Sequence, residues 1–430
     1  MAGQVVRRSL IKDGAWVSIG QIFSAAGTLI GIRILTEFVD PELFGAVTLI
    51  IGIVALALGT MTSPVMQAAL KFYPEYSNGR LAELRSTVYD ILIKRIVIFL
   101  SLVALATPIG VYYFKLEVSL VALCALLLIV DSMRSFEMVM LNASRKHTAY
   151  ALISVGEAWG RPIAAGIAVY FMGAAVKSIL MAYAIISGSI LLCFYIVVKP
   201  HIEVTAGARI NDKKTLKNLI HQFSLPLVPM SALGWMNGVG DRYLIGGLLG
   251  LEQAGVYAAV YGLMSRPFLI SSGIVELTLR PLYNKFVAQG KDKEAQNLLM
   301  KWLLSVALIT GAGFAAIALF DDFLISVLLA EKYRGGVTLM LWIAAGYVFL
   351  SLSDVFVKVC YAYGYTRRIL VIQVVGAVLS MVSAVVGIKL FGLLGAAMAV
   401  PAYFGIMLII TIFVSKKNVE NNPCTPSNDQ

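Results

Sequence analysis

Charged residues are scarce in this chain of 430 residues: Asp, Glu, Lys and Arg make up 14% of it, against about 25% in soluble domains. Cysteine and histidine are rarer still, with four and three residues. The cysteines show no metal-ligand spacing, which argues against a metal centre, and the histidines lie outside the central parts of the long apolar runs. A soluble domain and a histidine proton relay inside an apolar core are therefore both excluded.

Hydrophobic residues, by contrast, make up 59% of the chain, and the mean hydropathy is +0.84. Twelve apolar runs approach the ~20 residues that a helix needs to cross the hydrocarbon of a bilayer. Barrel strands would give alternating segments of only ~10 residues. We therefore predict an all-α polytopic membrane protein with twelve transmembrane helices. The runs are about 14–35, 43–66, 91–113, 118–139, 150–172, 176–198, 223–249, 254–279, 302–320, 337–359, 369–389 and 393–415.

Basic residues predict the topology. With the N-terminus inside, 26 of the 35 Lys and Arg residues fall in cytoplasmic segments and five in outer loops, so both termini are expected in the cytoplasm. The net charge of +11 then belongs mostly to loops that face membrane lipids. Because these residues are scattered over seven short segments, no nucleic-acid partner is expected.

A polar segment at residues 199–222 divides the runs into two sets of six. We predict an N-terminal lobe at 1–198, a cytoplasmic linker at 199–222, a C-terminal lobe at 223–415 and a disordered cytoplasmic tail at 416–430. Lys389 to Gly392 leaves room only for a tight hairpin between the last two runs.

The two halves share a sequence pattern. Arg33-Ile-Leu-Thr followed by Phe44-Gly45 recurs as Arg242-Tyr-Leu-Ile followed by Ala254-Gly255, at offsets of 209 and 210 residues. Six spans are an even number, so both lobes would start on the same side of the membrane. This predicts parallel six-helix lobes related by an axis along the membrane normal, around a central cavity, with the substrate site between them.

Four arginines lie inside the apolar runs, where a cation costs roughly 2.5–3.5 kcal/mol on insertion scales. Such residues usually face a bundle interior or a watery cavity, and the planar guanidinium suits phosphate. Pro267 and Pro162 each follow one of them and are expected to open the helix locally. The alternative role is a structural ion pair or a side chain that reaches the membrane surface. These candidate anion-binding residues are Arg266, Arg161, Arg242 and Arg33.

Acidic residues in the runs are candidates for binding a coupling proton or sodium ion. Glu157 lies four residues before Arg161, so the two are expected to pair as a lock or a switch. Each acid has an alternative structural role. The four candidates are Asp241, Glu157, Asp131 and Asp354.

Arg33-Ile-Leu-Thr, Pro41-Glu-Leu-Phe44-Gly45 and Lys71-Phe-Tyr-Pro-Glu resemble the polysaccharide-transporter branch of the multidrug/oligosaccharidyl-lipid/polysaccharide exporter superfamily, and most of all its O-antigen flippases (Wzx). The resemblance implies a transporter of the bacterial cytoplasmic membrane that moves undecaprenyl-pyrophosphate-linked oligosaccharide by alternating access. It implies no bound cofactor, with a proton or sodium gradient as driving force. Polysaccharide polymerase and chain-length proteins are further candidate partners.

Two alternatives stay open. A multidrug or organic-cation antiporter of the same superfamily would need a cavity of acidic character, and the acids in the spans do not exclude it. A membrane-embedded polymerase or acyltransferase would need a catalytic base or a sizeable outer loop. The longest outer loop, at about 321–336, contains no histidine, which disfavours the enzyme.

Overall fold

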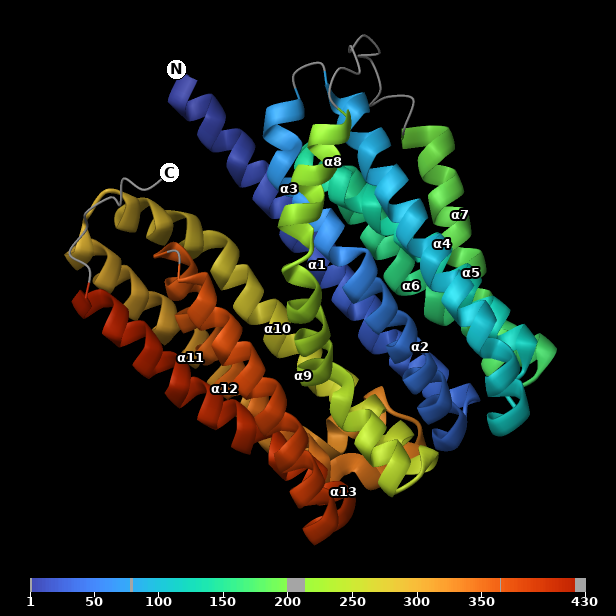
Figure 1. Cartoon of the computed structure of the whole chain (residues 1–430). Coiled ribbons are helices and arrows are strands. Elements are labelled where there is room, and N and C mark those ends of the chain that lie inside the picture. Colours follow the sequence, from blue (N-terminus) through green and yellow to red (C-terminus); the bar gives the residue numbers. More distant parts are fainter. Residues whose placement is uncertain (1, 78–79, 199–212, 364, 422–430) are drawn as a thin grey trace. The chain divides into compact units, whose positions relative to one another are not determined.

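The computed structural model describes residues 2–77, 80–198, 213–363 and 365–421, and it is built from α-helices (Figure 1). The chain forms two compact units. Unit 1 contains residues 1–39 and 46–235, and unit 2 contains residues 40–45 and 236–430. The division between them falls within α9, between Trp235 and Met236.

Among the described residues, unit 1 holds seven complete helices, most of α2, the start of α9 and a short π-helix at Phe194–Val198. The first turn of α2 is assigned to unit 2. The helices of unit 1 are α1 (Ala2–Phe38), α2 (Pro41–Met61), α3 (Ser63–Tyr76), α4 (Leu81–Phe114), α5 (Val118–Ala143), α6 (His147–Met172), α7 (Val176–Cys193), α8 (Lys213–Ser224) and the start of α9 (Leu227–Leu248). Unit 2 continues with α10 (Leu251–Ala288), α11 (Asp292–Leu328), a 3₁₀-helix (Glu331–Gly336), α12 (Val337–Ala362) and α13 (Thr366–Asn421).

Helices cover almost all of the twelve expected runs, and in the described residues nine of them are long and apolar enough to cross a membrane. Two causes explain why nine of the described helices meet this criterion although twelve spans are predicted. The nine leave out α6 and α9, which have 26 and 22 residues but carry intramembrane charges. The last two runs share the label α13, but they are two helices that meet at Phe391 and Gly392, where the backbone leaves helical φ/ψ. Gly392 has φ +60°, a conformation that favours glycine, at the place where the hairpin is expected.

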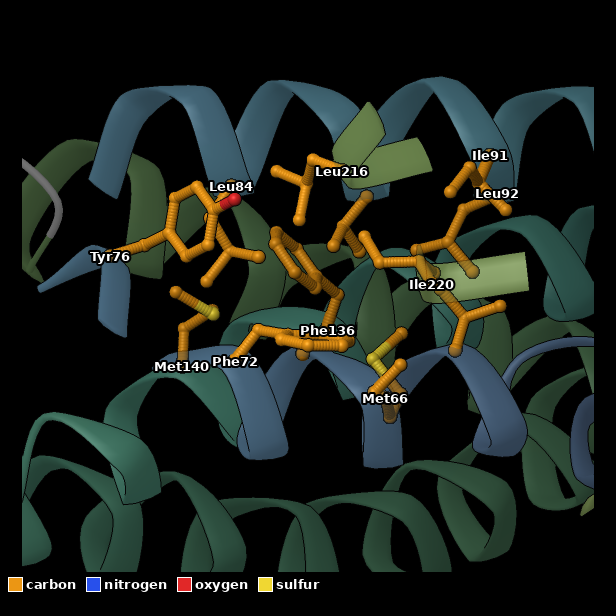
Figure 2. Close-up of a cluster of buried hydrophobic side chains, with 14 residues drawn as sticks. Met66, Phe72, Tyr76, Leu84, Ile91, Leu92, Phe136, Met140, Leu216 and Ile220 are labelled. Atoms are coloured by element: carbon orange, nitrogen blue, oxygen red, sulfur yellow. The ribbon is translucent and has the colours of Figure 1, made fainter. Parts of the chain in front are cut away.

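The core of unit 1 at one end of the bundle is a cluster of buried apolar side chains from α3, α4, α5 and α8 (Figure 2). Phe72 and Phe136 lie at its centre, and Leu216 and Ile220 of α8 are fully buried in it. Part of the segment expected as a linker is therefore a helix that packs against the first lobe. Residues 199–212 of that linker, and the end of the tail, lie outside the described residues.

Unit 2 is organised around α10, whose first half is almost entirely buried. Residues 41–45 pack against it through two glycines that match in the sequence repeat. A Cβ on Gly45 would lie 2.1 Å from the Leu251 carbonyl oxygen, and one on Gly255 would lie 1.8 Å from the Pro41 carbonyl oxygen. Each glycine thus packs against the backbone of the other segment, and only glycine fits at either position. Because the two glycines are equivalent in the repeat, at an offset of 210 residues, this contact supports duplication.

Candidate functional site

Unit 1 contains a cluster of four charged side chains that joins α5 to α6, here called the charge tetrad: Asp131, Arg134, Glu157 and Arg161. Arg161 Nη2 donates to Asp131 Oδ1 at 2.5 Å, and Arg134 Nη1 donates to Glu157. Contacts within each helix are longer, at 3.4 Å for Arg134 to Asp131 and 3.3 Å for Arg161 to Glu157. The Glu157–Arg161 pair expected from the sequence therefore exists, but the shorter contacts run between the helices.

The charge tetrad is neutral and largely removed from solvent, with side-chain exposures of 6–20%. Ser187 of α7 completes it by accepting hydrogen bonds from Arg161 at 2.6 and 3.2 Å. The Arg161 guanidinium also lies over the Tyr183 ring. Since a buried charge needs a partner, this arrangement holds α5, α6 and α7 together. Arg161 would have to leave its acidic partners before it could bind an anion.

Arg242 of unit 2 has a different environment. Its guanidinium lies 4.8 Å from the centre of the Tyr261 ring, and its Nε is buried without a hydrogen-bond partner among the described residues. The carboxylate of the neighbouring Asp241 already accepts two hydrogen bonds, one from the Tyr257 hydroxyl at 2.6 Å and one from the Arg242 backbone N–H at 2.8 Å. A buried guanidinium N–H without a partner is suited to a ligand that brings an acceptor.

Arg266 is the most accessible of the four candidate arginines. It is exposed in the middle of α10, directly before Pro267, and within the described part of the chain no acid or hydrogen-bond acceptor contacts it. Arg33 instead forms an exposed ion pair with Glu37 at 2.8 Å, one turn further along α1. The two units thus contain arginines in distinct states: Arg266 has no partner in the described part of the chain, whereas Arg161 and Arg33 are paired.

A polar cavity of about 190 Å³ lies within unit 2 between α10, α11 and α12. Glu276, Asp354 and Lys358 line it, and Lys358 lies 3.3 Å from Glu276. Asp354 has no ion pair in the described residues. The buried Trp302 Nε1 and Ser351 Oγ also line the cavity and have no hydrogen-bond partner there. At about 30 Å³ of liquid volume each, roughly six water molecules would fit and satisfy these groups.

Sequence reasoning missed a second buried ion pair. Arg85 of α4 donates to both oxygens of Glu137 at 2.8 Å, and the hydroxyls of Tyr89 and Tyr195 close the network. Both residues sit in stretches that continue the apolar runs, and pairing across 52 residues leaves no local spacing to detect. Trp302 and Ser351 were also missed, since a cavity has no sequence pattern.

The sequence matches the model of the polysaccharide biosynthesis protein family over residues 34–338, well over half of the chain. No curated protein matches it significantly. Solved structures share the fold across nearly the whole chain at low identity. One is an inward-facing multidrug resistance MATE family transporter, which is 12% identical with a TM-score of 0.75, over 94% of this chain and 98% of that one. Another is the lipid II flippase MurJ in an inward closed conformation, which is 14% identical with a TM-score of 0.70, over 94% of this chain and 89% of that one. A third is a MOP superfamily transporter from Pyrococcus furiosus, which is 12% identical with a TM-score of 0.68, over 97% of each chain.

These likenesses define the class: a multi-pass, all-α membrane protein with the fold shared by MATE transporters and MurJ. The chain belongs to the polysaccharide biosynthesis protein family, whose model matches residues 34–338.

Proposed function

We propose that this protein is a flippase that moves undecaprenyl-pyrophosphate-linked oligosaccharide, such as an O-antigen repeat unit, across the bacterial cytoplasmic membrane. Twelve spans in two parallel lobes and alternating access between them are part of this proposal. Membership of the polysaccharide biosynthesis family supports it, as does the fold shared with a lipid II flippase. The observation that carries it is Arg266, an exposed cation inside an apolar helix that has no partner among the residues the structure describes.

The pyrophosphate is the part of such a substrate that an arginine would bind. A guanidinium presents two parallel N–H groups to a phosphate, and a desolvated charge-assisted contact is worth about 1.5–3 kcal/mol. We assign the first contact to Arg266 and a second to Arg242, whose Nε lacks a partner. Arg161 and Arg33 would contribute only after exchanging their carboxylate partners for phosphate.

Ion coupling is assigned to Asp354 among the four candidate acids. Asp131 and Glu157 are held by arginines, and Asp241 by a tyrosine hydroxyl and a backbone N–H. Asp354 lines the polar cavity of unit 2 without an ion pair in the described residues. A proton or sodium ion entering there would find a carboxylate in a site large enough to be hydrated. Asp354→Asn should therefore abolish the dependence of transport on the ion gradient.

The test of substrate binding uses Arg266→Ala, Arg266→Lys and the control Arg334→Ala, which removes an exposed arginine outside α10. Export of the lipid-linked glycan and the amount of protein in the membrane are measured together. Arg266→Ala should weaken substrate binding by roughly ten- to a hundredfold at normal abundance, and Arg266→Lys should retain part of the function because the charge remains. Normal export by an Arg266→Ala, Arg242→Ala double variant would end the proposal.

A multidrug antiporter is the second candidate, favoured by the MATE fold. Proteoliposomes separate the two functions. Gradient-driven efflux of an organic cation without movement of the polyprenyl-linked glycan would establish the antiporter, and the reverse result would support the flippase.

A further inference from the structure

Basic side chains gather on one outward face of unit 1, along α4 and α8. This α4/α8 basic face consists of Lys94, Lys213, Lys214 and Lys217. Within the described residues the acid that pairs with this face is Asp90, which holds Lys213 at 2.8 Å. Four cations against one acid leave a net positive charge at a single place on the surface.

The two helices are fixed in register, so these lysines cannot separate. Figure 2 shows Leu216 and Ile220 of α8 pointing into the apolar cluster beneath the helix. At the end of α8, Arg95 Nη2 donates to the buried Ser224 hydroxyl at 2.9 Å. Lys94 and Lys217 consequently lie side by side, and the neighbouring Lys94 ammonium lowers the pKa of Lys217. Two like charges held together in this way repel each other unless an anion lies between them.

The length of α4 places this face at the membrane surface. After Arg95 the helix continues for 18 residues, 96–113, without a charge, which is about 27 Å and close to the thickness of the hydrocarbon layer. Side chains in that stretch are exposed as lipid contacts would be, such as Leu105 at 74%. Lys94 lies just before the stretch, at the depth of lipid headgroups. Leu219 of α8 is exposed beside it and would contact the upper part of the acyl chains.

We propose that the α4/α8 basic face is a binding site for an anionic phospholipid, with one headgroup phosphate held between Lys94 and Lys217. Headgroup phosphates are the anions present at this depth, and clusters of basic residues at the cytoplasmic membrane surface attract acidic lipids. The positive-inside pattern assigns this face to the cytoplasmic leaflet. The site does not depend on which substrate the protein transports.

The experiment measures lipid binding to the purified full-length protein by native mass spectrometry, with phosphatidylglycerol and phosphatidylcholine as probes. Wild type should bind the first phosphatidylglycerol in preference to phosphatidylcholine. Lys94→Gln with Lys217→Gln should weaken that binding roughly thirtyfold, and the corresponding double change to Arg should preserve it. The matched control is Lys291→Gln with Lys293→Gln, which removes two exposed lysines from unit 2 and should leave the first binding event unchanged.

Thermal unfolding in phosphatidylcholine shows whether the glutamine variant is folded. It should unfold at the same temperature as wild type or higher, because the repulsion between Lys94 and Lys217 is gone. Added phosphatidylglycerol should raise its unfolding temperature less than it raises that of wild type. Unchanged phosphatidylglycerol preference in this variant, or an equal loss in the control variant, would overturn the proposal. Displacement of the lipid by millimolar inorganic phosphate would also overturn it, since the site would then bind free anions.

Discussion

Removing Arg161 should destabilise the protein more than removing any exposed arginine. Arg161→Gln deletes the 2.5 Å contact to Asp131, whose side chain is 6% exposed. Of the contacts between described residues, that carboxylate then keeps only the one at 3.4 Å from Arg134. Removing one partner of a buried pair typically costs about 3–5 kcal/mol, because the remaining charge has lost its solvation and its counter-ion. That cost is a large part of a stability of about 5–15 kcal/mol. Thermal unfolding of a fluorescent fusion in detergent, with its abundance in the membrane, measures the effect.

Two further variants make this result interpretable. Arg33→Gln breaks an ion pair whose side chains are 36% and 57% exposed, so it should cost about 0–1 kcal/mol. Asp131→Asn combined with Arg161→Gln replaces the ion pair by two neutral amides and should recover most of the loss. If Arg161→Gln is no less stable than Arg33→Gln, or if the double variant is less stable than either single one, the charge tetrad does not hold α5 and α6 together.

Three further predictions concern other parts of the chain. Gly255→Ala should lower the unfolding temperature, because overpacking costs about 1–3 kcal/mol and its Cβ would meet the Pro41 carbonyl, whereas Gly247→Ala has open space and should be neutral or stabilising. Trp302→Phe removes an indole N–H that no described protein group accepts and should cost less than about 1 kcal/mol in unfolding experiments, against about 3–5 kcal/mol for alanine. Burial, with Arg95 and Lys217 nearby, lowers the pKa of His221 below its ordinary 6.5. The unfolded chain therefore binds more protons near that pH, stability falls on acidification through it, and His221→Gln should reduce that pH dependence in thermal unfolding.

The sequence was sufficient for the class of fold, because run length and the scarcity of charge are direct consequences of a hydrocarbon environment. It also located the hairpin at Gly392 and the intramembrane charges. It could not predict which charges pair: helical spacing predicted Glu157 with Arg161, whereas Arg134 of the adjoining helix contacts Glu157 more closely. Nor could it predict that one face of α8 packs into unit 1, since eight of the twelve residues of that helix are polar and its apolar face has meaning only beside α3 and α4.

The charge tetrad also has a consequence for biosynthesis. On emerging from the ribosome, α5 carries Asp131 and Arg134 and α6 carries Glu157 and Arg161. These two tetrad charges alone would cost each isolated helix roughly 5–7 kcal/mol on entering lipid. Each finds its closest counter-ion on the other helix. We therefore expect the insertion machinery to release the two segments together, as a helical hairpin in which the ion pairs between α5 and α6 have already formed. A chain truncated after α5 would leave that helix poorly anchored, although its hydropathy alone is high enough for a membrane span.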